Sequence, residues 1–122
     1  MLMLAHNPAA AYRRVELDAR IEAAGAADLT RICLEEAIAA LGQALLALER
    51  TPQAVPRERL ERAQTILLWL ARSVAPAHPL RESLVTFYAG LASQIAASFV
   101  RPRSEDIARV RDDLNDLLAA AG

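Results

Sequence analysis

The stretch Gln64-Thr65-Ile66-Leu67-Leu68-Trp69-Leu70 carries more large apolar side chains than one helix of a small bundle can bury. At about 100° per residue on a helix, one face collects a seam of apolar side chains: Leu60, Ala63, Leu67, Leu70 and Val74. Leu68 and Trp69 point away from this seam on either side. Because exposed apolar surface usually marks a docking site, the chain is predicted to be a binding protein. The alternative is a helix covered on three sides by its neighbours, or by the amino-terminal segment.

The composition of the chain favours a single all-α domain. Its 122 residues are enough for one core and too few for two. Hydrophobic residues make up 54% but aromatic residues only 4%, which suits helices packed through small side chains better than a β-sheet. The formal net charge of -1 offers no broad electrostatic surface for nucleic acid or an anionic membrane. We therefore expect neither of these partners.

The compartment is predicted from cysteine usage and hydropathy. Cys33 is the only cysteine, so an intramolecular disulfide is impossible, and its apolar neighbours predict a small buried side chain. No apolar run approaches the roughly 18 residues that span a bilayer, so no membrane insertion is expected. The start of the chain lacks the basic and apolar regions of a secretory signal. The protein is predicted to be soluble and cytoplasmic.

Prolines divide the sequence into four helical stretches, because each proline removes a backbone donor inside a helix. The first helix is expected from Asp28 as N-cap to Arg50, with a seam of apolar residues spaced by four and three: Leu34, Ile38, Leu41, Leu45 and Leu48. The others are expected over residues 56–75, 79–100 and from Ser104 to near the end. Short connections make neighbouring helices antiparallel, which predicts an up-down four-helix bundle over residues 28–122. Residues 1–27 are expected to form an amino-terminal arm or a short extra helix.

The third of these helices carries two adjacent apolar stripes, which predicts a central position. The stripes are Leu80, Leu84, Phe87 and Leu91, and Val85, Tyr88, Ile95 and Phe99. His78, in the turn before this helix, is expected to cap it.

Catalytic and metal-binding patterns are missing from the sequence. Bundles that hold metals use Glu-x-x-His pairs on facing helices, and this chain has none. Glu35-Glu36 and Asp112-Asp113 are adjacent on helices, so their carboxylates diverge and cannot share a proton. We therefore expect no enzymatic activity, no cofactor and no metal.

Four segments carry a recognisable pattern in order, namely residues 11–15, 29–38, 63–70 and 84–88, and together they resemble the flagellin-specific export chaperone family, FliS. Ala11-Tyr12-Arg13-Arg14-Val15 is similar to its amino-terminal Ala-Tyr-x-x-Val, and residues 29–38 resemble its Leu-Ile-x-Met-Leu-Tyr-Asp-Gly-Ala-Leu helix. Residues 63–70 resemble Lys-Ala-x-x-Ile-Ile-x-x-Leu, and Leu84-Val85-Thr86-Phe87-Tyr88 resembles Asn-Leu-x-x-Leu-Tyr. The resemblance covers roughly residues 11 to 118.

The resemblance implies a cytoplasmic flagellar export chaperone with four helices. Such a protein holds the disordered C-terminal region of flagellin in an apolar groove, prevents premature polymerisation and aids secretion, with a secretion-gate component as a further partner. Because the first-helix motif has Glu35-Glu36 where the family has Asp-Gly, a divergent relative with a different export client stays open. A structural or regulatory bundle that forms a constitutive homodimer is the other alternative.

The predicted partner-binding residues come from three segments of the sequence. The groove is assigned to Leu68, Trp69, Val85, Tyr88 and Phe99. Tyr12 and Val15 of the arm are expected to cover this groove when it is empty and to move aside when the client binds.

Overall fold

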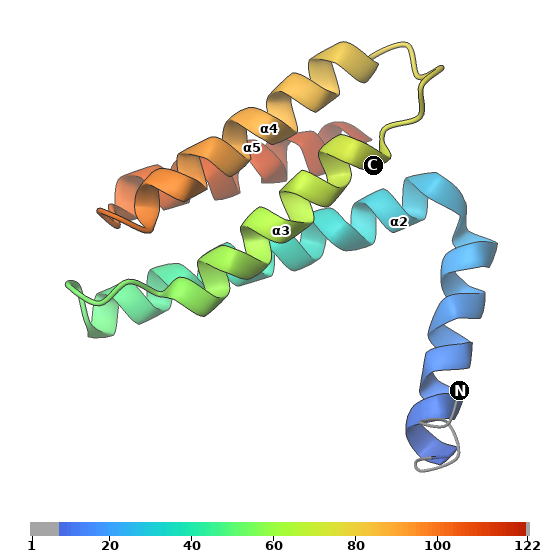
Figure 1. The fold of residues 1–122 in the computed structure, drawn as a ribbon, viewed down its shortest axis with the longest axis horizontal. Helices are drawn as coiled ribbons and strands as arrows, with labels where there is room; N and C mark the ends of the chain where they lie inside the picture. Colours follow the sequence, from blue (N-terminus) through green and yellow to red (C-terminus); the bar gives the residue numbers. More distant parts are fainter. Residues whose placement is uncertain (1–7, 122) are drawn as a thin grey trace. The chain divides into compact units, whose positions relative to one another are not determined.

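The structure is a computed structural model that describes the backbone from Pro8 to Ala121 and side chains from Ala27 to Ala120. The backbone described has four helices and no strand, and Figure 1 labels each helix. They are α2 (Pro8–Arg50), α3 (Arg57–Ser73), α4 (Arg81–Ser98) and α5 (Ser104–Ala121). The predicted all-α four-helix bundle is confirmed.

The start of the first helix differs from the prediction. No helix begins at Asp28, because α2 is already helical from Pro8 and passes through this residue. The segment between them is rich in alanine, the best helix former, and a single glycine at position 25 costs only about 1 kcal/mol. The helical backbone therefore continues where an N-cap was expected. The chain divides into two compact units, Met1–Thr30 and Arg31–Gly122. The predicted boundary between residues 27 and 28 stays a prediction.

The core of the second unit is built from one apolar stripe on each helix. On α2 the seam residues Leu34, Leu41 and Leu48 are buried, while Ile38 and Leu45 are half-buried against them. The stripe of α3 is the one that its sequence predicts: Leu60, Ala63, Leu67 and Leu70 are buried, and Val74 packs against them. Ala37, Ala40 and Ala44 of α2 are buried as well. The rest of the core comes from α4 and α5: Tyr88, Leu91, Ala92, Ile95, Ile107, Val110 and Leu114.

Prolines and short connections set the ends of the helices. Pro56 precedes α3, and its carbonyl accepts a hydrogen bond from the Leu60 N–H at 3.1 Å. At the start of α5, the Arg103 carbonyl accepts the N–H groups of Asp106 and Ile107 at 3.0 and 3.2 Å. Connections this short return the chain alongside the helix it has just left, so consecutive helices of the second unit run in opposite directions (Figure 1).

His78 organises the turn between α3 and α4. Its Nδ1 accepts a hydrogen bond from the N–H of Leu80, the residue before α4, at 2.9 Å. Its carbonyl accepts the N–H of Arg81, the first residue of α4, at 3.1 Å. Since the first N–H groups of a helix have no partner inside it, these bonds satisfy donors that would otherwise face only water. The side-chain cap that the sequence predicted is not formed: Leu80 is the N-cap residue of α4, no side chain caps the helix, and His78 holds the turn before it instead.

Adjacent leucines of α3 differ in burial, which gives a direct test of the core. Leu67 is 0% exposed and Leu68 is 44% exposed. We expect Leu67→Ala to lower the free energy of unfolding by about 2 to 5 kcal/mol, because it removes buried methyl groups and leaves a cavity. Leu68→Ala should lower it by about 1 kcal/mol or less. Urea denaturation followed by circular dichroism measures both values, and equal losses would contradict this packing.

Candidate functional site

Two polar contacts show which flank of α3 faces which neighbour. The amide Nε2 of Gln64 donates to the backbone carbonyl of Ala92 on α4 at 3.3 Å. The guanidinium of Arg62 forms an ion pair with the Glu36 carboxylate of α2 at 2.7 Å. Gln64 and Arg62 lie on opposite sides of the buried stripe of α3, about 160° apart around the helix. Helix α3 therefore has one flank toward α4 and the other toward α2.

The flank of α3 toward α4 carries Leu68. It lies one turn after Gln64 and therefore on the same side of the helix. On α4, Val85 and Phe99 lie two turns before and after Ala92, and both are half-buried. The guanidinium carbon of Arg57 lies 5.5 Å from the centre of the Phe99 ring, which places Phe99 beside the start of α3. We call Leu68, Val85 and Phe99 the α3–α4 face.

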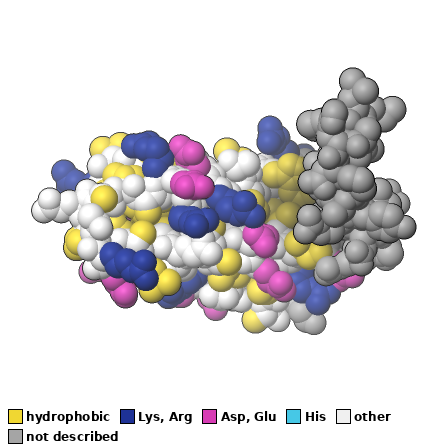
Figure 2. Space-filling view, turned by 90° about the horizontal axis from the view of Figure 1, so that it is seen from below, with side chains coloured by type: hydrophobic (Ala, Val, Ile, Leu, Met, Phe, Trp, Pro, Cys, Tyr) yellow, Lys and Arg dark blue, Asp and Glu magenta, His cyan; other side chains and the backbone are white. Residues whose placement is uncertain are grey.

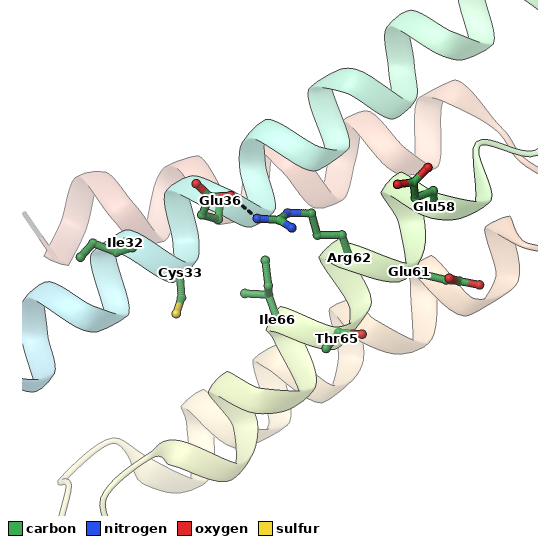
Figure 3. Close-up of a pocket in the computed structure, with 8 residues that line it drawn as sticks. All are labelled: Ile32, Cys33, Glu36, Glu58, Glu61, Arg62, Thr65 and Ile66. Atoms are coloured by element: carbon green, nitrogen blue, oxygen red, sulfur yellow. Dashed lines mark hydrogen bonds and ion pairs between the residues drawn. The ribbon is translucent and has the colours of Figure 1, made fainter. Parts of the chain in front are cut away.

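The flank of α3 toward α2 borders a hollow of about 520 Å³. It is lined by Ile32, Cys33, Glu36, Glu58, Glu61, Arg62, Thr65 and Ile66. Figure 3 shows Cys33 and Ile66 pointing into the space between the two helices, with Arg62 reaching across to Glu36. We call this the α2–α3 hollow.

Trp69 lies on the side of the α2–α3 hollow. It follows Thr65 and Ile66 by one helical turn, so the three side chains share this flank. It is 39% exposed, which is unusual for so large an apolar side chain. Leu68 and Trp69 are thus both exposed, as predicted, but the two flanks of α3 separate them. The assignment of both residues to a single groove stays a prediction.

Tyr88 was predicted to line the groove, but its side chain is buried in the core. It is 3% exposed and belongs to the core of the second unit with Leu91 and Ile95. The sequence placed it in one stripe with Val85 and Phe99, but the middle of that stripe is turned into the bundle and only its two ends approach the surface. Burial, and secondarily the Cys33 thiol, raises the pKa of the Tyr88 hydroxyl. The Tyr88 hydroxyl therefore stays neutral, and its side chain packs in the core beneath the surface.

The other predicted residues of the site are Tyr12 and Val15. Both lie in α2, whose backbone is helical there, but their side chains fall outside the described residues.

The sequence pattern did not indicate Ile32 and Ile66 as residues of the site, and it predicted a buried Cys33. Cys33 is only half-buried, at the wall of the hollow. A usable signal was present in the sequence: Ile66 precedes Trp69 by three residues, and Ile32 and Cys33 come just before the buried Leu34. Apolar residues next to the buried stripe of a helix lie at the border of the core, where a partner helix can pack against them.

The walls of the hollow carry charge of both signs. Three carboxylates, from Glu36, Glu58 and Glu61, accompany the single guanidinium of Arg62. Arg62 and Glu36 are both about half-exposed, so their ion pair contributes at most about 1 kcal/mol to stability. Across the face drawn in Figure 2, apolar side chains lie among acidic and basic ones, and neither sign forms a continuous patch.

Features of other classes of site are missing from the described part of the chain. Its residues include no cluster of three or more His, Cys, Asp or Glu side chains placed to hold a metal ion. No helix in this part is long and apolar enough to cross a membrane.

Comparison with known proteins matches the chain to a protein family. The family model of FliS, flagellar protein FliS, matches residues 8–120, which is nearly the whole chain. No curated protein and no solved structure matches the chain.

The Cys33 thiol reports on the charge of the hollow. Burial, and secondarily the Glu36 carboxylate, raises the pKa of this thiol above its ordinary value. Replacing Glu36 by Gln removes the negative charge that disfavours the thiolate and leaves Arg62 without its partner. We therefore expect Glu36→Gln to lower the pKa of Cys33, measured from the pH dependence of iodoacetamide alkylation. The control is Glu35→Gln, at an exposed neighbouring position outside the hollow, and an unchanged or higher pKa in Glu36→Gln would contradict this geometry.

Proposed function

Because the chain belongs to the FliS family of flagellar export chaperones, we propose that it binds the disordered C-terminal region of flagellin along both flanks of α3. One observation carries the proposal: α3 exposes large apolar side chains on both sides of its buried stripe, with Leu68 44% and Trp69 39% exposed. A client held there is kept from polymerising prematurely and is delivered for secretion. The place of action is the cytoplasm, where a client is met before export.

The two apolar surfaces suit an amphipathic segment that folds as it binds. Such a segment presents anchors at i, i+3, i+4 and i+7, which fit apolar depressions between helices of a rigid partner. The α2–α3 hollow offers Ile66 and Cys33 beside Trp69, and the α3–α4 face offers Leu68, Val85 and Phe99. Since the two surfaces lie on opposite sides of one helix, a client that uses both must cross over α3. A flexible chain does this more readily than a folded domain.

The energetics allow binding that is tight and reversible. Burying about four anchors at roughly 1.5 to 3 kcal/mol each yields on the order of 6 to 12 kcal/mol. Ordering a disordered client costs about 2 to 5 kcal/mol or more of this. What remains is compatible with a chaperone that must release its client at the secretion gate, which we propose as a second partner.

The amino-terminal part of the chain has a role of its own in the proposed function. Tyr12 and Val15 are the tyrosine and the valine that match the family's amino-terminal Ala-Tyr-x-x-Val motif. We propose that they occupy part of the client surface when no client is present. A competing segment of the same chain would lower the apparent affinity for the client by the fraction of time that the surface is covered.

Double replacement of Leu68 and Trp69 by Ser tests the client surface. We expect binding of the C-terminal segment of flagellin, encoded in the same genome, to weaken at least about tenfold, because two anchors lose apolar contact. Isothermal titration calorimetry measures the affinity, and circular dichroism should show unchanged helicity because neither residue is buried.

The matched control replaces two exposed leucines away from the flanks of α3, Leu46 (55% exposed) and Leu80 (59% exposed), by Ser. This variant should bind the flagellin segment as the unchanged chain does. Equal weakening in both variants, or a chain that ignores flagellin and is a dimer at every concentration, would favour the structural bundle instead.

Replacement of Tyr12 and Val15 by Ser tests the covering role of the amino-terminal segment. If these residues compete with the client, their loss should tighten flagellin binding severalfold in the same titration. Unchanged or weaker binding would show that they do not cover the surface.

A further inference from the structure

The α2–α3 hollow combines an apolar lining with an excess of carboxylates. Ile32 and Cys33 of α2 and Ile66 of α3 supply the apolar lining, and Figure 3 shows Cys33 and Ile66 pointing into the space between the helices. The volume of about 520 Å³ lies within the range of pockets that hold small organic ligands, so a large apolar side chain of a partner fits there. The charged residues of the lining decide which other side chains can accompany that apolar anchor.

The excess of negative charge comes from two glutamates at the start of α3. Glu36 is neutralised by Arg62, whose guanidinium lies 2.7 Å from its carboxylate. Glu58 and Glu61 also line the hollow, and both are exposed. Neither of them forms an ion pair with another residue of the described part of the chain. Two carboxylates of the lining therefore have no cationic partner in this part.

The other arginines in the first turn of α3 do not supply this cation. The guanidinium carbon of Arg57 lies 5.5 Å from the centre of the Phe99 ring, so this side chain reaches toward α4. Arg59 is exposed and does not line the hollow. The cations nearest in sequence therefore leave Glu58 and Glu61 available to a partner.

Helix stability accounts for only one of these two carboxylates. Glu58 lies in the first turn of α3, where the helix dipole stabilises a negative charge. Glu61 lies beyond that turn, and the effect of the dipole falls off within it. Solvation suits a carboxylate at any exposed position of a helix. What distinguishes Glu61 is that it shares an apolar hollow with a second unpaired carboxylate.

We propose that the client segment seated in the α2–α3 hollow carries a lysine or arginine close to its apolar anchor, and that Glu58 and Glu61 bind this cation. The inference rests on the proposed function and adds to it the charge of the client. Glu61 precedes Ile66 by a rise of about 7.5 Å along α3. A basic residue one to two turns from the anchor of a helical client therefore reaches the carboxylates.

Charge complementarity of this kind selects among apolar clients. An apolar anchor gives affinity for many amphipathic segments, whereas two unpaired carboxylates beside it favour a basic segment and disfavour an acidic one. Because the carboxylates are exposed, their contribution to the affinity is modest and decreases with salt. The apolar lining therefore holds the client, and Glu58 and Glu61 discriminate between clients.

Replacement of both carboxylates by uncharged amides tests their role. We expect Glu58→Gln combined with Glu61→Gln to weaken binding of the C-terminal segment of flagellin about three- to tenfold at low salt, because two exposed charge contacts are lost. The difference should shrink at high salt, where exposed charges are screened. Isothermal titration calorimetry of the full chain measures the affinity at each salt concentration.

The matched control removes the same charge from two exposed positions of α2 outside the hollow, by Glu35→Gln combined with Glu49→Gln. This variant should bind the flagellin segment as the unchanged chain does. Circular dichroism should show the same helicity in both variants, because all four glutamates are exposed.

A double-mutant cycle identifies the cation on the client. Each lysine and arginine of the flagellin segment is replaced by glutamine in turn, and each segment is titrated into the unchanged chain and into the variant that lacks Glu58 and Glu61. We expect at least one replacement to weaken binding to the unchanged chain and to have little further effect on the variant, because the same contact is already lost there. Additive losses at every basic residue of the client would show that the two carboxylates contact none of them.

The thiol of Cys33 reports whether the client enters the hollow. Cys33 is the only cysteine of the chain, and it lines the hollow. Saturating flagellin segment should slow its alkylation by N-ethylmaleimide, measured by mass spectrometry. The variant that lacks Glu58 and Glu61 should need a higher concentration of the segment for the same protection.

Failure of this inference and failure of the proposed function give different results. An unchanged chain that does not bind the flagellin segment overturns both. If the segment binds but the variant that lacks Glu58 and Glu61 is as tight as the control, or if Cys33 stays as reactive in the complex, only the inference fails. Tighter binding to that variant would also overturn it, because the client would then present an acidic group to the hollow.

Discussion

The packing of the bundle and the surface of α3 both depend on the burial of one stripe of α3 against the other helices. The stripe consists of Leu60, Ala63, Leu67 and Leu70. This burial fixes the rotation of α3 about its own axis. Once the stripe faces the core, residues on either side of it must come to the surface along the neighbouring helices. The ion pair between Arg62 and Glu36 and the hydrogen bond from Gln64 to Ala92 follow from this rotation more than they cause it, because an exposed ion pair and a single hydrogen bond each add only about 1 kcal/mol.

The same rotation of α3 decides which of its apolar side chains are left exposed for binding. A helix with apolar residues on three sides cannot bury them all in a bundle this small, so the surplus is divided between its flanks. Leu68 lies on the flank toward α4, and Trp69 lies one turn after Thr65 and Ile66, which line the α2–α3 hollow. Both surfaces are rigid because they belong to helices held by the core. A rigid apolar surface favours a flexible partner, since only one side of the complex then has to be ordered.

Much of the fold could be predicted from the sequence because its signals are local. Prolines end helices through backbone geometry alone, and the three-four spacing of leucines places Leu34, Leu41 and Leu48 in the core of α2. His78 acts within two residues of its own position, but it holds the turn before α4 and does not cap the helix as predicted. The predicted helix start at Asp28 was wrong because an N-cap residue only permits a start, and the alanine-rich segment before it favours helix more strongly.

The sequence by itself determined the helices, their apolar stripes and the fact that α3 carries more apolar surface than its stripe uses. Only the tertiary structure decided which neighbouring helix lies on each side of α3, that Tyr88 is buried, and that Ile66 and Cys33 line one hollow. The physical reason is that periodicity gives the angle between two side chains on one helix. Which helix lies beside each of them depends on how all the stripes pack together, and that is a property of the whole bundle.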